Sequence, residues 1–288
     1  MIDWPRELIE DIARRRCVLF LGSGVSKNSL SHDSTLRPPD WLEFLSDGLA
    51  QCDNPRKHIK RLLREQDYLT ACEIIKDKMG ERWHRYVNDR FVQPRFQPAD
   101  IHRDIFRLDC RVVLTQNVDK VYDTFALAES HNTVYVKQYF DTDVARVVRG
   151  DRRCVLKAHG SVDSVTKMVF TRKDYSDARY QFPRFYALLD ALVLTHTFLF
   201  LGCGLSDPDV RLMLERHAQV FPDSRPHVMV MSSKAVHAEV RECFFRNLNL
   251  QFLTYKPDDH HRELQASVKE LVTLTEEVRR GLAATLDW

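Results

Sequence analysis

Four short segments, polar or rich in glycine, each follow directly after an apolar run, and their residue types suit the binding of a nucleotide. Residues 22–26 (Gly-Ser-Gly-Val-Ser) and 202–206 (Gly-Cys-Gly-Leu-Ser) are turns that begin with glycine. Residues 115–119 (Thr-Gln-Asn-Val-Asp) and the pair His159 and Gly160 follow two further apolar runs. Ligands of an open parallel sheet lie just outside the carboxyl ends of its strands, so the four segments predict one nucleotide-binding crevice.

The first glycine turn has two interpretations. Gly22 and Gly24 let the backbone turn sharply and approach a pyrophosphate, whose charge the amides of a helix N-terminus would bind. However, Lys27 stands where the dehydrogenase fingerprint has its third glycine, and no Gly-Lys-Ser/Thr follows to complete a Walker motif. A tight turn with no ligand explains this pattern about as well as a phosphate site does.

The segment 115–119 places polar side chains where a strand becomes a helix. Asn117 could simply cap that helix, and Asp119 could favour its dipole. Because a cap needs only one such residue, the whole run favours a ligand site.

His159 ends an apolar run and precedes a glycine, which predicts an imidazole at the rim of the crevice. A single histidine is more often structural, but this position suits a general base or a ribose ligand. In the last turn, Asp207 is a good helix cap and Pro208 a good first helical residue. That role does not explain the two glycines and Ser206 directly after the strand.

The elements that would position these residues alternate along the chain. Short apolar runs predict buried strands at residues 17–21, 111–114, 133–136, 154–156, 198–201, 227–231 and 252–255. Helical spacing predicts helices at residues 118–128, 183–194, 236–248 and 263–280 and from residue 208, whereas residues 161–182 read as irregular. This alternation predicts an α/β fold with a parallel sheet and right-handed crossovers.

Two regions fall outside that alternation. Asp3 is expected to cap a first helix that has Pro5 near its start. From Trp41 to Val92 the apolar residues recur at helical spacing without strand-like alternation. We therefore predict an all-helical insertion over residues 41–98, after the first strand.

Composition excludes several classes of protein. A net charge of +2 over 288 residues does not call for nucleic acid or an anionic membrane as a partner. The seven cysteines include no Cys-x-x-Cys pair, which argues against a disulfide framework and a structural zinc site. The N-terminus lacks the features of a signal peptide, and the longest apolar span, residues 185–194, is too short to cross a bilayer. We expect a cytoplasmic protein with reduced thiols.

The four segments, in this order, resemble the sirtuin family, specifically its sirtuin-like branch without a zinc module. Residues 171–175 (Thr-Arg-Lys-Asp-Tyr) also resemble a segment common in that branch. The resemblance covers most of the chain outside the helical insertion. It implies a single sirtuin-like NAD-binding domain over residues 1–288, with a Rossmann-like parallel sheet, helices on both faces and no zinc module.

The resemblance also implies roles for individual residues. NAD+ would bind across the crevice as the substrate, with no metal. Asn117 would position the ribose or a water molecule, His159 would be the base near the ribose hydroxyls, and Asp119 would hold the nicotinamide carboxamide. The residues implied to bind the dinucleotide are Gly22, Ser23, Gly24, Ser26, Gln116, Asp119, Gly202, Gly204 and Ser206.

The activity implied is that of an NAD+ glycohydrolase, which releases nicotinamide and ADP-ribose. In this branch such enzymes act in bacterial defence against phage, so we expect a homo-oligomer regulated by a partner, either an ATPase or a nucleic-acid-sensing protein. The alternatives are an NAD-dependent deacylase or ADP-ribosyltransferase, which needs an acceptor, and a non-catalytic module that senses NAD or ADP-ribose. A dehydrogenase is the least favoured alternative because of Lys27.

Overall fold

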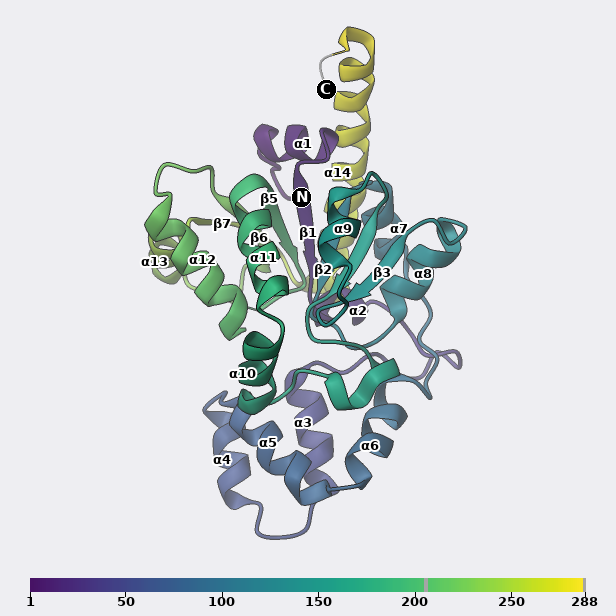
Figure 1. Ribbon diagram of the computed structural model, residues 1–288, viewed down its shortest axis with the longest axis vertical. Helices are drawn as coiled ribbons and strands as arrows, with labels where there is room; N and C mark the ends of the chain where they lie inside the picture. The colour runs from purple at the N-terminus through teal and green to yellow at the C-terminus, as the bar shows by residue number, and fades with distance from the viewer. Residues whose placement is uncertain (205–206, 287–288) are drawn as a thin grey trace.

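The computed structural model describes residues 1–204 and 207–286, which are organised around one parallel sheet (Figure 1). The described strands lie in the order β3-β4-β2-β1-β5-β6-β7, and all neighbouring pairs are parallel. Their bounds are β1 Cys17–Leu21, β2 Val112–Thr115, β3 Tyr135–Gln138, β4 Cys154–Lys157, β5 Thr197–Leu201, β6 His227–Ser232 and β7 Leu250–Tyr255. The predicted parallel α/β sheet is confirmed.

Strand β1 lies at the centre, where the strand order reverses. Leu21, its last residue, pairs with Thr115 of β2 on one side and with Leu201 of β5 on the other. The loops that follow β1, β2 and β5 therefore leave the sheet at the same edge. In open α/β sheets this reversal point is where ligands bind.

Helices cover both faces of the sheet, so β1 is buried on both sides. Leu19 and Leu21 pack into one core and Val18 and Phe20 into the other, as the alternation of side chains along a strand requires. The first face carries α1 Arg6–Ala13, α7 Asp100–Arg107, α8 Val121–Glu129 and α14 Asp258–Thr285. The second carries α9 Val144–Arg149, α11 Pro183–Thr195, α12 Pro208–Val220 and α13 Ala238–Leu248.

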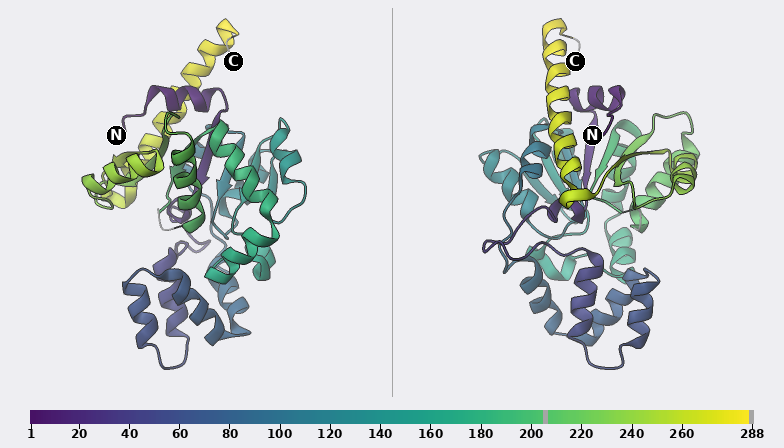
Figure 2. Two further views of the ribbon diagram at one scale, coloured as in Figure 1. Left: turned by 60° about the vertical axis from the view of Figure 1, so that its left-hand side comes forward. Right: turned by 180° about the vertical axis from the view of Figure 1, so that it is seen from behind.

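A separate group of helices lies at the carboxyl edge of the sheet, and Figure 2 shows it at that end from two further directions. It consists of α3 Trp41–Ala50, α4 Lys57–Arg64, α5 Tyr68–Met79 and α6 Arg82–Phe91, which we call the helical module. The module has its own core, in which Phe44, Ile75 and Trp83 pack together with Met168 and Phe170 from the sheet half. The predicted helical character of this region is confirmed, whereas its outer boundary at residue 98 stays a prediction.

Residues 161–182 are not irregular, so that prediction was wrong. They form a 3₁₀ helix, Val162–Lys167, and α10 Arg172–Gln181. Thr171 begins α10 with a capping box, in which its Oγ1 accepts from the Asp174 amide at 3.1 Å and the Asp174 carboxylate accepts from the Thr171 amide at 3.0 Å. Only Tyr175 and Ala178 of this helix are buried, too few for a visible helical pattern.

Three further details near the sheet differ from the prediction. Asp3 does not cap the first helix, because Pro5 occupies the N-cap position of α1 and makes no side-chain capping bond. Helices α7 and α9 were not predicted. Helix α7 has eight residues and α9 has six. In α9 the three buried valines, Val144, Val147 and Val148, alternate with Arg146 and Arg149, so the apolar pattern is short and interrupted.

Candidate active site

A cavity of about 270 Å³ lies between the carboxyl edge of the sheet and the helical module. Most of the residues predicted to bind a dinucleotide or act on it line this cavity. They are Gly22, Ser23, Ser26, Gln116, Asn117, Asp119, His159, Gly202 and Gly204. Ser206 lies outside the described residues. The cavity thus brings together segments that are far apart in the sequence.

The two glycine loops, residues 22–26 and 202–204, touch each other through their backbones. The amides of Gly22 and Gly24 each donate a hydrogen bond of 3.0 Å, to the carbonyls of Leu201 and Gly202. A Cβ on Gly22 would come within 2.4 Å of the Gly202 carbonyl oxygen. A Cβ on Gly202, whose φ is +64°, would meet the Val25 nitrogen at 2.4 Å. These glycines therefore permit a close approach that no larger residue allows.

Gly24 is not among the residues that line the cavity, and its predicted contact with the phosphates stays a prediction. Its amide is already bonded to Gly202, and a Cβ at Gly24 would lie 2.9 Å from the Gly202 Cα. Loop packing is sufficient to explain the glycine at position 24.

Asn117 is fixed by its neighbours in an orientation that leaves one atom available. Its Nδ2 donates to the Gly22 carbonyl and to Ser26 Oγ, both at 3.0 Å. Its backbone amide donates to Thr115 Oγ1 at 3.1 Å, and that hydroxyl donates to the Leu21 carbonyl at 2.9 Å. Among the side chains of residues 1–204, 207–258 and 261–286, none donates a hydrogen bond to Asn117 Oδ1. This oxygen can accept a hydrogen bond from a substrate hydroxyl or a water molecule.

Asp119 helps to begin helix α8 rather than serving the cavity alone. Its Oδ1 accepts a hydrogen bond of 2.9 Å from the Val121 amide, at the start of that helix. The helix-dipole alternative considered for Asp119 is therefore part of its role, although the residue also lines the cavity.

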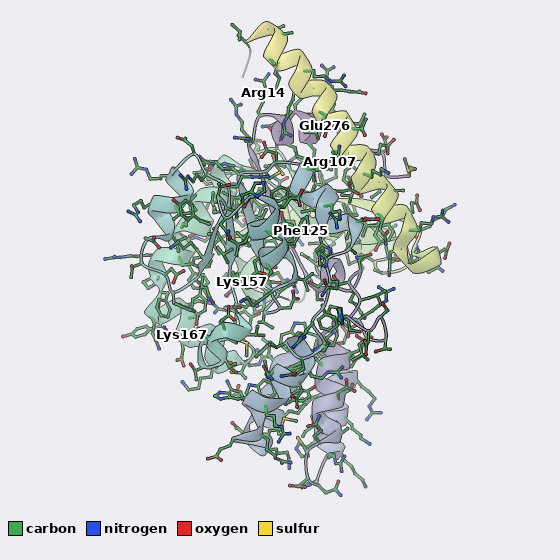
Figure 3. The ribbon with its side chains drawn as sticks, turned by 90° about the vertical axis from the view of Figure 1, so that its right-hand side faces the viewer. Arg14, Arg107, Phe125, Lys157, Lys167 and Glu276 are labelled. Atoms are coloured by element: carbon green, nitrogen blue, oxygen red, sulfur yellow. The ribbon has the colours of Figure 1, made fainter. Side chains whose placement is uncertain are left out.

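A buried lysine, Lys157, contacts this loop; Figure 3 marks its position in the sheet half. Lys157, at the end of β4, is 1% exposed, and its Nζ donates to the Asp119 carbonyl at 2.5 Å and to Asp123 Oδ2 at 3.3 Å. Burial raises the pKa of the Asp123 carboxyl, against the attraction of the lysine. The hydrogen bond to the Asp119 carbonyl ties the loop that carries Asn117 to β4, and the ion pair with Asp123 ties helix α8 to the same strand. A lysine within an apolar run is the sequence signal that could have indicated it.

His159 lies beside a carboxylate and a phenol. Its Nε2 is 3.4 Å from Asp207 Oδ2, and the Tyr175 hydroxyl donates to that same oxygen. The Tyr175 ring stands edge-on to the imidazole, with 5.1 Å between ring centres. Burial lowers the pKa of His159, and the charges of Asp207 and Asp209 only partly oppose this. The imidazole is therefore neutral at pH 7 and able to accept a proton.

Asp207 has two roles at once. Its Oδ1 accepts from the Val210 amide at 2.8 Å and caps α12, with Pro208 as the first helical residue, as predicted. Its Oδ2 faces His159 and Tyr175. One carboxylate thus fixes a helix start and orients a candidate base.

The module side of the cavity is aromatic. Trp41 and Phe44 from α3 pack against Phe170, with ring centres 5.5 and 5.6 Å from it. Arg172 of α10 reaches across to α5 and donates to Asp67 at 2.9 Å and to Thr70 at 3.1 Å. These contacts connect the module to the helix that carries Tyr175.

Comparison with known proteins shows which family the sheet half of the chain resembles. A model described as "SIR2-like domain" matches residues 111–253, which include the segment 115–119, His159 and the second glycine loop. This part of the chain is therefore similar to the SIR2-like domain family. The resemblance expected from the four ordered segments is confirmed.

Three curated relatives are similar over most of the chain. NAD(+) hydrolase ThsA of Enterococcus faecium is 27% identical over 77% of this chain and 44% of its own length. ThsA of Bacillus cereus (strain MSX-D12) is 25% identical over 84% of this chain and 48% of its own. Defense-associated sirtuin 2 of Bacillus subtilis is 24% identical over 78% of this chain and 21% of its own. The chain therefore spans less than half the length of each of these relatives.

Sequence reasoning missed three groups of the candidate site. Tyr175 was placed in an irregular segment, Asp207 was seen only as a cap, and Lys157 was not considered. The segment 171–175 was noted as a family resemblance but given no role. The capping pair Thr171 and Asp174 is the signal that could have predicted α10, and with it the position of Tyr175.

The described part of the chain has neither a metal-binding cluster nor a membrane-spanning helix. Among the side chains of residues 1–204, 207–258 and 261–286, no group of three or more histidine, cysteine, aspartate or glutamate residues is arranged to hold a metal ion. No described helix is both long and apolar enough to span a bilayer.

Proposed function

We propose that the SIR2-like domain is an NAD+ glycohydrolase that cleaves the bond between nicotinamide and ribose. One observation carries the proposal: the available Oδ1 of Asn117 and the neutral imidazole of His159 line the same cavity, beside the two glycine loops. The relatives named NAD(+) hydrolase ThsA support it.

The reaction asks for little acid catalysis, because nicotinamide leaves a cationic nucleotide as a neutral molecule. The electrons of the bond between C1′ and nitrogen go to the nicotinamide ring, and the ribose develops oxocarbenium character. Asn117 Oδ1 would accept a hydrogen bond from a ribose hydroxyl or from the attacking water. Fixed dipoles of this kind stabilise charge without having to reorganise.

His159 would accept the proton that the attacking water loses as the new C1′–oxygen bond forms. Asp207 would orient the imidazole and stabilise its cationic form, while Tyr175 holds the carboxylate in place. The aromatic wall of Trp41, Phe44 and Phe170 would exclude bulk water and face the nicotinamide ring, and Asp119 would bind its carboxamide.

For the whole protein we propose the biological setting that the relatives' names suggest, namely depletion of NAD+ in anti-phage defence. A constitutive NAD+ hydrolase would harm its host. We therefore propose a cytoplasmic homo-oligomer whose activity is controlled by a partner protein, either an ATPase or a nucleic-acid sensor. A purified monomer that hydrolyses NAD+ at its full rate with no partner would contradict this regulation.

The test of the activity is to incubate the full chain with NAD+, with and without an acetylated peptide, and to resolve the products by chromatography. We expect nicotinamide and ADP-ribose in equal amounts, formed at the same rate with or without the peptide. Turnover only in the presence of the peptide would favour a deacylase or ADP-ribosyltransferase. Binding without turnover would favour a sensing module.

A further inference from the structure

A second cavity, of about 380 Å³, lies on the other side of His159. Its walls come from β1, α11 and α12, and its apolar lining includes Phe20, Phe185, Leu189, Val210 and Met213. The proposed chemistry of the first cavity makes no use of this space.

The two cavities share a wall. Gln116, His159 and Asp207 line both of them. A molecule in the second cavity would therefore lie against the same imidazole that, in the first cavity, faces the reacting ribose.

The charged groups around the second cavity are paired with one another. Asp209 accepts hydrogen bonds from Arg179 Nε and, at 3.1 Å, from the Tyr186 hydroxyl. Arg216 donates to Asp190 at 3.0 Å. With these charges matched and most of the remaining lining apolar, the space suits a neutral ligand with a hydrocarbon body better than an ion.

We infer that the second cavity binds a small apolar alcohol, which attacks the ribosyl cation in place of water. The inference rests on the proposed function and adds to it a transfer activity. The balanced step is NAD+ plus R–OH giving O-alkyl ADP-ribose, nicotinamide and one proton. The alcohol oxygen forms the new bond to C1′, nicotinamide keeps the electrons of the broken bond, and His159 accepts the hydroxyl proton.

The direct test is how the yield of alkyl ADP-ribose depends on the chain length of the alcohol. The full chain is given NAD+ with methanol, 1-butanol or 1-hexanol at equal concentration, and the ratio of alkyl ADP-ribose to ADP-ribose is measured by chromatography and mass spectrometry. Each added methylene that enters an apolar cavity should raise this ratio, by up to about fourfold. A ratio that does not rise with chain length, or a complete absence of alkyl product, would overturn the inference.

A variant that fills the cavity makes the test specific. Ala187, on α11, is exposed and lines the second cavity, so we expect Ala187→Trp to reduce 1-hexanol capture at least about tenfold while hydrolysis by water continues. Leu212→Trp, on the exposed side of α12, fills the same space from the opposite wall. Ala128→Trp, exposed on α8, is the matched control.

The outcomes separate the two proposals. Equal alcohol capture by the two cavity variants and by Ala128→Trp would contradict the second site alone. If the wild-type chain releases no nicotinamide under any condition, the proposed function itself fails. If only an acylated peptide, and no simple alcohol, accepts the ribosyl group, the assignment of a small alcohol is wrong.

Discussion

The two walls of the first cavity are built in different ways. On the sheet side, hydrogen bonds between backbone and side chains lock the loops to one another, as where Asn117 binds Gly22 and Ser26. On the module side, aromatic rings pack together, and polar contacts such as that between Arg172 and Asp67 cross to α10 at a largely exposed site. Exposed ion pairs of this kind contribute only about 0–1 kcal/mol.

The two walls therefore have different functions: the sheet wall would carry out the reaction, and the module wall would enclose the substrate. The groups that would act on the substrate are held by the sheet edge, where a small displacement costs hydrogen bonds. The groups that would exclude water come from a helical module with a separate core. Changes to the sheet wall should therefore affect the chemical step or the fold, whereas changes at the contact between module and α10 should affect substrate binding.

The largest effect is expected from removing the candidate base. His159→Ala should lower kcat for nicotinamide release by about 10²–10⁴-fold, because it removes the imidazole that would accept the proton. The measurement is steady-state product formation by chromatography. His84→Ala, an exposed histidine on the module, is the control and should leave kcat unchanged. Equal rates for the two variants would remove His159 from the mechanism.

The next largest effect concerns stability at the contact between the glycine loops. Gly202→Ala should lower the free energy of unfolding by more than about 2 kcal/mol, because it combines a strained positive φ with a backbone clash at Val25. Denaturant titration gives the difference. Gly281→Ala, in α14 with no atom within 4 Å of the added Cβ, should instead stabilise by about 0.5–1 kcal/mol. A Gly202→Ala chain as stable as the wild type would contradict the loop packing.

The pH dependence of kcat/KM tests the role of His159 in the sheet wall. Because burial lowers the pKa of His159, the imidazole should stay neutral below the ordinary value of about 6.5. We expect kcat/KM to hold as pH falls through 6.5 and to decline only at lower pH, as the base becomes protonated. Asp207→Asn removes a charge that raises this pKa, so the decline should shift to still lower pH. A decline that begins well above pH 6.5 would exclude His159 as the group observed.

The smallest effect is expected at the contact between the module and α10. Arg172→Ala removes the bonds to Asp67 and Thr70 and should raise KM for NAD+ about twofold to fivefold, with kcat nearly unchanged. The adjacent Lys173→Ala, which breaks only an exposed pair with Asp177 within α10, is the matched control. A large loss of kcat in Arg172→Ala would show that the two walls are not separable.

The sequence was most informative for residues that directly follow a strand, because the end of the strand determines where such a residue lies. Apolar runs followed by polar turns predicted the parallel sheet, and with it the convergence of Asn117, His159 and the glycine loops on one cavity, because parallel strands end at a common edge. The same reasoning did not reveal that Gly24 packs against Gly202, since the approach of one backbone loop to another that is distant in the sequence leaves no local pattern.

Side-chain partners were the least predictable part. The contact of Tyr175 with Asp207 depends on how α10 packs, and that helix buries too few apolar residues to be recognised from periodicity. The sequence indicates only that Lys157 lies at the end of a strand. The hydrogen bond from its Nζ to the Asp119 carbonyl is seen only in the folded chain. Local spacing predicts elements, whereas these pairings follow from tertiary packing.

The most direct test of the account is a crystal structure of His159→Ala grown with NAD+, a variant expected to bind the substrate without cleaving it. The account predicts an intact dinucleotide in the first cavity, with C1′ of the nicotinamide ribose within about 4 Å of Asn117 Oδ1. A dinucleotide bound elsewhere, or one whose ribose lies away from Asn117 and the vacated imidazole position, would contradict it.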